Sequence, residues 1–262
     1  MRKAINIVTL FLFSQLFLSF AFAELPSSEY FASLSLLLPL VWFCVPFVKK
    51  SECAKISFDI RAALPYLLLF PLFLLAVIIT SSLTAAVSSF VGYTPTPVVP
   101  TGSGLEIIVF SVILPAISEE LFCRWAALRL LSPYSTRGAV VVSALLFAVM
   151  HGNFYQMPYA FVAGLALGVI TLASGSLMTA VFFHALNNLV SVFLYYLGDS
   201  AAFALLTVLA VATPVCLVIF YRRGGLARIR LVLSGAGVRA MLIAVFSSLA
   251  LLYIIFMLAF AI

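Results

Sequence analysis

Apolar runs long enough to cross a bilayer follow one another along almost the whole chain, with only short polar breaks between them. Hydrophobic residues make up 65% of the sequence and charged residues 8%, which leaves too little polar surface for a water-soluble globule. Stretches such as Tyr66 to Ile79 are apolar on every face and lack the alternation typical of strands. The sequence therefore predicts an all-α, polytopic transmembrane helix bundle.

The length of the apolar runs predicts eight or nine membrane helices, at about 20 residues for each span. The first 23 residues, with Arg2 and Lys3 before an apolar run, fit a signal-peptide-like segment or a first membrane helix equally well. Residues 24–262 are expected to form a single transmembrane domain with a catalytic core at about 104–197. The other spans are expected at about 30–48, 62–91, 104–131, 138–153, 157–174, 176–197, 200–221 and 240–262.

Basic residues gather at one side of the predicted bundle. When the spans are threaded with the N-terminus inside, all fourteen lysines and arginines fall on or toward that side, whereas Glu24, Glu29 and Asp199 fall on the other. The positive-inside rule then predicts cytoplasmic basic loops. The net charge of +6 therefore marks helix ends, and nucleic acid is not an expected partner. The signal-peptide-like start and compact loops favour a bacterial inner (cytoplasmic) membrane, with the lipid bilayer as partner.

Ionisable side chains inside membrane spans are costly, so each one needs an explanation. In the span at about 104–131, Glu120 and Arg124 are four residues apart and are expected to pair on one helix face. Such a pair could merely hold helices together. Glu119 is rotated by about 100° from Glu120, so it is expected to point elsewhere and to be free for another task.

The only two histidines of the chain lie in later spans. Phe147 stands one turn before His151, and His184 shares a helix face with Asn188. A rise of 1.5 Å per residue places Glu119 and both histidines about 12 to 20 Å from the inner ends of their spans. These side chains can therefore meet, although an amide such as that of Asn188 often only links helices.

Two further features of this region concern helix packing. Gly164 and Gly168 form a GxxxG pattern, which permits close helix contact. Pro115, one turn before Glu119, is expected to disturb its helix near the carboxylates.

Three motifs on successive helices resemble those of the CAAX-processing and bacteriocin-processing protease family (CPBP, also called Abi), which contains the eukaryotic type II CAAX prenyl endopeptidases. The family pattern is EExxxR, then FxxxH, then HxxxN or HxxxD. The matching residues here are Glu119 and Glu120 with Arg124, Phe147 with His151, and His184 with Asn188.

The resemblance implies a role for each of these residues. Glu119 would be the general base and would hold the attacking water together with His151. His184 and Asn188 would form the oxyanion hole, which in enzymes is often worth several kcal/mol. Three residues would support the site, two as an ion pair and one by shaping the cavity: Glu120, Arg124 and Phe147.

A metal-dependent reaction is the alternative mechanism, because Glu119, His151 and His184 are the kinds of ligand that bind zinc in catalytic sites. We favour the metal-free mechanism and expect no cofactor. The chain has no HExxH motif, and Asn188 is a poor zinc ligand whose presence an oxyanion role explains better.

The sequence thus predicts an intramembrane endopeptidase that hydrolyses a peptide bond of a membrane-associated or lipidated peptide or protein, with a site that opens toward the cytoplasmic half. A proton-coupled transporter or channel is the first alternative, because intramembrane Glu and His also form proton relays. A non-catalytic bacteriocin-immunity or scaffold membrane protein is the second.

Overall fold

The structure is a computed structural model of the 262-residue chain and describes residues 1–23, 35–45, 56–93, 102–234, 237–246, 251 and 254–255. These residues are almost entirely helical, and their only β-type pairing is an isolated bridge between Ser57 and Ser176. The all-α prediction is confirmed. The helical elements are α1 (Arg2–Ala23), η1 (Leu40–Cys44), η2 (Leu64–Leu69), α4 (Phe70–Phe90), α5 (Gly104–Glu106), η3 (Ile107–Ile113), α6 (Leu114–Glu120), η4 (Leu121–Leu128), α7 (Arg129–Leu131), α8 (Thr136–Met150), α9 (Met157–Ser174), α10 (Leu177–Arg222), α11 (Gly225–Leu233) and α12 (Val238–Phe246).

Four helices in the described part of the chain are long and apolar enough to cross a membrane, and a fifth is gained if the bent pair α11 and α12 counts as one span. The four are Arg2–Ala21, Leu64–Phe90, Met157–Ser174 and Leu177–Arg222. Eight or nine membrane helices therefore stays a prediction. Two features lower the number: the segment 104–131 is divided into short pieces, and α10 covers two of the predicted spans.

The segment 104–131 is helical throughout but contains two π-helical stretches between α-helical pieces. Stretches η3 and η4 are π-helical, and α6 lies between them. Pro115, near the start of α6, has no N–H to donate within the helix, so a change of winding beside it is expected. Short π-helical stretches inside α-helices are often found at functional sites. Here the two of them flank Glu119 and Glu120.

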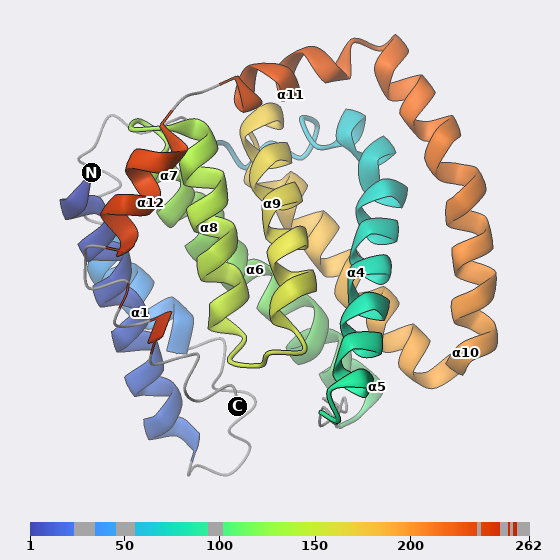
Figure 1. The fold of residues 1–262 in the computed structure, drawn as a ribbon, viewed down its shortest axis with the longest axis horizontal. Coiled ribbons are helices and arrows are strands. Elements are labelled where there is room, and N and C mark those ends of the chain that lie inside the picture. The colour runs from blue at the N-terminus through green and yellow to red at the C-terminus, as the bar shows by residue number, and fades with distance from the viewer. Residues whose placement is uncertain are drawn as a thin grey trace.

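Helix α10 bends at Gly198, which has a positive φ of 74° and a non-helical ψ of −166°. Glycine adopts such a conformation without the steric cost that a side chain would bring. The two arms of α10, before and after Gly198, correspond to the spans predicted at about 176–197 and 200–221. Figure 1 shows the second arm standing at the outer edge of the molecule.

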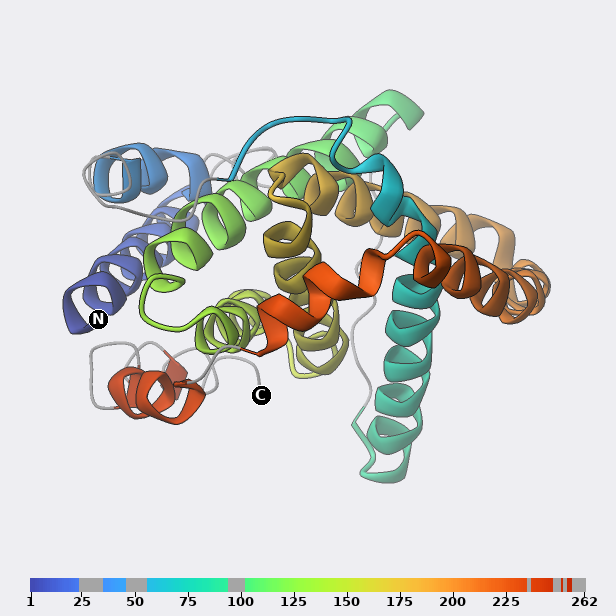
Figure 2. The same ribbon diagram turned by 90° about the horizontal axis from the view of Figure 1, so that it is seen from above.

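Helices α8 and α9 form the centre of the bundle. Seen from above in Figure 2, α1 and α12 lie on one side of this pair, and α4 and α10 lie on the other. At Gly164 of α9 an added Cβ would stand 2.9 Å from the Cα of Ala144 on α8, which is too close for any side chain. The GxxxG pattern therefore marks a close helix contact, as expected.

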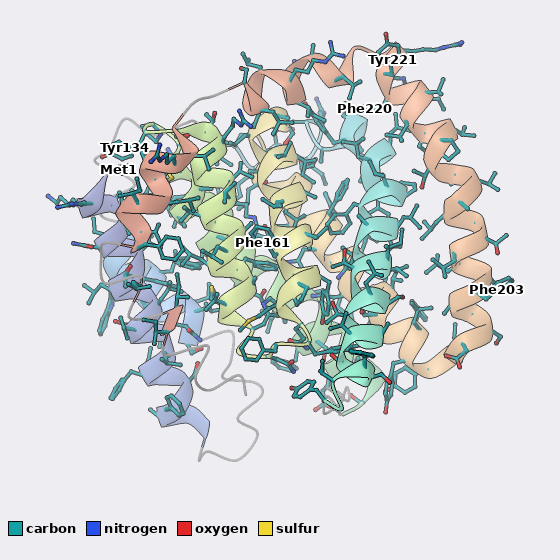
Figure 3. The ribbon with its side chains drawn as sticks, viewed as in Figure 1. Met1, Tyr134, Phe161, Phe203, Phe220 and Tyr221 are labelled. Carbon is teal, nitrogen blue, oxygen red and sulfur yellow. The ribbon has the colours of Figure 1, made fainter. Side chains whose placement is uncertain are left out.

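Most of the loops rich in arginine lie at one end of the molecule. Figure 3 shows Met1, Tyr134 and Tyr221 at this end, and each is close in sequence to a basic residue, Arg2, Arg137 and Arg222 respectively. Helix α11, which carries Arg228 and Arg230, crosses the same end. We call this end of the molecule the arginine end.

Specific bonds tie the helices together at the arginine end. The hydroxyl of Tyr66 donates to the carbonyl of Ala173 at 2.6 Å, which sets the start of the η2–α4 helix level with the end of α9. The hydroxyl of Thr136 donates to the carbonyl of Val232 at 3.1 Å, which joins α11 to the start of α8.

Candidate active site

A fully buried ion pair lies at the centre of the candidate site. Glu120 ends α6, Arg124 follows one turn later in η4, and neither side chain is exposed to solvent. Arg124 Nη1 donates to Glu120 Oε1 at 3.2 Å. The Nε to Oε2 distance of 3.1 Å is an ion-pair contact, but the atoms are not aligned for a hydrogen bond. The predicted pairing of Glu120 with Arg124 is thus present.

Gly164 is a partner of this pair that sequence reasoning did not identify. Arg124 Nη2 donates to the backbone carbonyl of Gly164 at 3.2 Å, across from η4 to α9. The carbonyl is reachable because the glycine lets α9 approach its neighbours closely. The GxxxG pattern could point to close packing, but a backbone acceptor leaves no signal of its own in a sequence.

The imidazole of His184 lies between two carboxylates. Its Nδ1 is 2.8 Å from Glu120 Oε1, and its Nε2 is 4.0 Å from Glu119 Oε2. Because an ionised carboxylate only accepts, Nδ1 carries the hydrogen in the first contact. Glu119 was expected to point away from Glu120. Instead, the two neighbouring carboxylates approach opposite sides of the same ring.

The ring of Phe147 is the common neighbour of the charged and titratable groups. His151 and His184 both meet it edge to face, with centroid distances of 5.0 and 5.5 Å. The guanidinium carbon of Arg124 lies 4.6 Å from the ring centroid, a cation–π contact. Phe147 itself is buried in α8. It therefore lies in contact with both histidines, and its shaping of a cavity stays a prediction.

His151 stands at the end of α8, and its ring orientation is held by the backbone. Its Nδ1 is 2.7 Å from the carbonyl oxygen of Phe147, which can only accept, so Nδ1 carries a hydrogen. In the neutral ring the other nitrogen, Nε2, then has a free lone pair. His151 can therefore accept a hydrogen bond from water or substrate.

The remaining groups of the site are partly open. The side chain of Glu119 is 20% exposed, whereas that of Glu120 is fully buried. Asn188 lies one turn beyond His184 on α10 and is half-buried. Among the residues the structure describes, no side chain is hydrogen-bonded to its amide. Six of the seven predicted residues thus form one set of contacts, and Asn188 lies beside it.

Zinc was the alternative cofactor, with Glu119, His151 and His184 as ligands. Within the described ranges, no three His, Cys, Asp or Glu side chains are placed to share a metal ion. Nδ1 of each histidine contacts another group, Phe147 for His151 and Glu120 for His184, so only Nε2 of each ring could face a metal ion. The three side chains do not fit a zinc site in this arrangement.

A family model described as "Rce1-like: Type II CAAX prenyl endopeptidase Rce1-like" matches residues 101–190. The match covers about a third of the chain and includes every residue of the three motifs. No curated protein and no solved structure matches the chain significantly. The resemblance to this protease family is therefore confirmed over the segment that carries the site. Together with the apolar helices, this similarity supports an integral membrane protein and a peptidase activity in general.

Proposed function

We propose that the chain is an intramembrane endopeptidase that uses Glu119 to activate water against a peptide bond of a membrane-associated or lipidated substrate. The observation that carries the proposal is the position of His184 between Glu120 and Glu119. A catalytic group held by one carboxylate and facing a second, partly open one is a common arrangement for acid and base chemistry.

In the proposed reaction, water donates one hydrogen bond to the carboxylate of Glu119 and a second to the lone pair on Nε2 of His151. Glu119 takes the proton as the water oxygen bonds to the substrate carbonyl carbon, and later passes it to the leaving amine as the C–N bond breaks. Water and a peptide bond are consumed, and a carboxylic acid and an amine are released; the acid then passes its proton to the amine, which leaves a carboxylate and an ammonium group. No metal ion takes part in these steps.

His184 and Asn188 would stabilise the negative charge on the carbonyl oxygen. Because Nδ1 of His184 donates to Glu120, the ring donates from Nε2 only when it carries both hydrogens. The nearby carboxylates offset the positive charge of that form, while the amide of Asn188 supplies a neutral donor. Glu120 would thus orient His184 as well as pair with Arg124.

We also propose that the arginine end faces the cytoplasm of a bacterial cell, and that the spans predicted from hydropathy lie in its inner membrane. The basic residues near Met1, Tyr134 and Tyr221 support this orientation through the positive-inside rule. On this view, the two arms of α10 are separate membrane spans.

The test is cleavage of a fluorogenic peptide library by the detergent-purified protein, as wild type and as Glu119→Ala, with and without a strong zinc chelator. We expect wild-type cleavage that the chelator leaves unchanged and the substitution abolishes. Undiminished cleavage by Glu119→Ala would refute the proposal. Loss on chelation that zinc restores would instead show a metalloprotease, and proton flux in liposomes without any cleavage would favour a transporter.

A further inference from the structure

The packing of the bundle changes at the level of the candidate site. Between the site and the arginine end, the helices are tightly packed. On α10, Leu177, Ala180 and Phe183 are at most 1% exposed. On η4, the chain from Phe122 to Leu128 is fully buried except at Trp125. Aromatic rings seal the same layer, because Phe70 and Phe73 both meet the ring of Phe183 edge to face.

On the other side of the site, α10 leaves the packed bundle. No residue of α10 from Ala185 to Val208 is buried, and Leu186, between His184 and Asn188, is 36% exposed. The segment before Glu119 is buried on one face only: Val112 and Ala116 are buried, whereas Ile117 is 37% exposed and Ile113 is 42% exposed. The partly open carboxylate of Glu119 therefore lies at the level where α10 leaves the packed bundle.

The hairpin of α8 and α9 turns back before the ends of the neighbouring helices α1 and α4. From Ala173, whose carbonyl accepts from Tyr66, α9 runs about 24 Å to Met157, whereas η2 and α4 together run about 36 Å from Tyr66 to Phe90. Figure 1 shows the α8–α9 turn ending before the lower ends of α1 and α4. With 15 residues, α8 spans about 22 Å of a hydrocarbon layer about 30 Å thick.

The recessed turn carries polar groups directly beside His151. It is irregular backbone that includes Asn153, whose side-chain oxygen accepts from the N–H of Tyr155, and Phe154, which is 39% exposed. Irregular backbone at membrane depth occurs only where protein buries it or water reaches it. The turn is only partly buried, which indicates that water reaches this level from the end opposite the arginines.

From these three observations we propose that water and substrate reach the site from the end opposite the arginine end. The cytoplasmic opening expected from the sequence is thereby reversed. This inference rests on the proposed function and specifies its substrate class. With the arginine end in the cytoplasm, the substrate is a peptide segment presented at the outer face of the membrane, in an exported or membrane-anchored chain. A tail that stays in the cytoplasm would not reach the site.

The test is labelling of single cysteines with a membrane-impermeant maleimide in right-side-out and inside-out vesicles. Asn188→Cys and Phe154→Cys report the site and the recessed turn, and neither readout requires activity. Tyr134→Cys, in the turn at the arginine end, is the matched control and is 52% exposed. The background carries Cys44→Ala, Cys53→Ala and Cys216→Ala and keeps Cys123, which is fully buried.

We expect Asn188→Cys and Phe154→Cys to react only in the vesicles that protect Tyr134→Cys. Reaction of Asn188→Cys from the same side as Tyr134→Cys, from both sides, or from neither side would overturn the inference. If Asn188→Cys alone unfolds, Phe154→Cys decides by the same criterion.

A second arm separates this inference from the proposed function. Peptide added outside either kind of wild-type vesicle should be cut only where the end opposite the arginines faces out, and in both after detergent treatment. Cleavage restricted to the other orientation would overturn the inference and leave the protease proposal standing. No cleavage even in detergent would refute the protease proposal, whereas the labelling pattern would still decide which side reaches the site.

Discussion

The candidate site joins two regions of opposite character. In the buried region, Glu120 contacts both Arg124 and His184, and Arg124 also donates to the Gly164 carbonyl. In the open region, the side chain of Glu119 is 20% exposed, and no side chain among the described residues is hydrogen-bonded to the amide of Asn188. Charges in a low-dielectric interior need partners, whereas groups that act on a substrate must remain available for it. On the proposed function, the buried region orients the catalytic groups and the open region acts on the substrate.

The contrast is sharpest between adjacent residues. Glu119 and Glu120 have the same side chain and approach the same histidine, at 4.0 and 2.8 Å. What separates them is burial and the number of partners. Substitutions in the two regions should therefore differ in kind: those in the buried region should affect stability, and those in the open region should affect turnover alone.

Arg124→Met should produce the largest loss. It leaves Glu120 buried without its cation, and breaking a buried pair costs about 3 to 5 kcal/mol. The control Arg129→Met removes a partly buried arginine that lies 5.6 Å from the Trp125 ring, a contact worth about 1 kcal/mol. Denaturant unfolding in detergent measures both. Equal losses in the two variants would remove the distinction between the regions.

Asn188→Ala should slow peptide cleavage by about 10²- to 10³-fold, the usual effect of removing one oxyanion donor. Its unfolding midpoint should match that of wild type, because no described side chain is hydrogen-bonded to the amide. Asn187→Ala, the neighbouring half-buried amide, is the control and should leave turnover unchanged. A destabilised Asn188→Ala with normal turnover would assign Asn188 to helix packing.

Gly164→Ala should have a smaller effect on stability. The new methyl group would meet the Ala144 backbone at 2.9 Å and push α9 away from Arg124, at a cost of about 1 to 3 kcal/mol. In Gly168→Ala the nearest atom to the new methyl group is a side-chain carbon of Val140 at 3.3 Å, so this substitution should cost less. Thermal unfolding of the two variants side by side measures the difference. A larger loss in Gly168→Ala would show that the bond from Arg124 to Gly164 contributes little.

Hydropathy and motif spacing predicted much of this molecule. The span at 157–174 has the bounds of α9, and the motif residues on three helices lie together as the equal-depth argument required. Both inferences rest on regular helix geometry, in which the position in the sequence sets depth and face. Within one regular helix, the spacing of residues is therefore enough to predict the depth and the face of each side chain.

The predictions failed or were incomplete where tertiary packing decides. From the 100° rotation between them, Glu119 was predicted to point elsewhere than Glu120. The rotation could not show that the imidazole of His184 lies between the two carboxylates. The Gly164 carbonyl and the changes of helix winding around α6 depend on contacts between helices, which no single helix pattern encodes. The side from which the site opens also depends on packing between helices, and the labelling experiment decides between the cytoplasmic opening expected from the sequence and the opposite opening proposed above.

The most direct test compares Glu119→Gln with Glu120→Gln in peptide cleavage and in unfolding. Both substitutions keep the size of the side chain and remove its charge. We predict that Glu119→Gln unfolds like wild type but loses about 10²- to 10⁴-fold in rate, the range of a general base. Glu120→Gln should lose stability as well as activity. Retained cleavage in Glu119→Gln, or the same loss of stability in both variants, would contradict the central claim. That claim is that Glu120 stabilises the site and Glu119 acts as the general base.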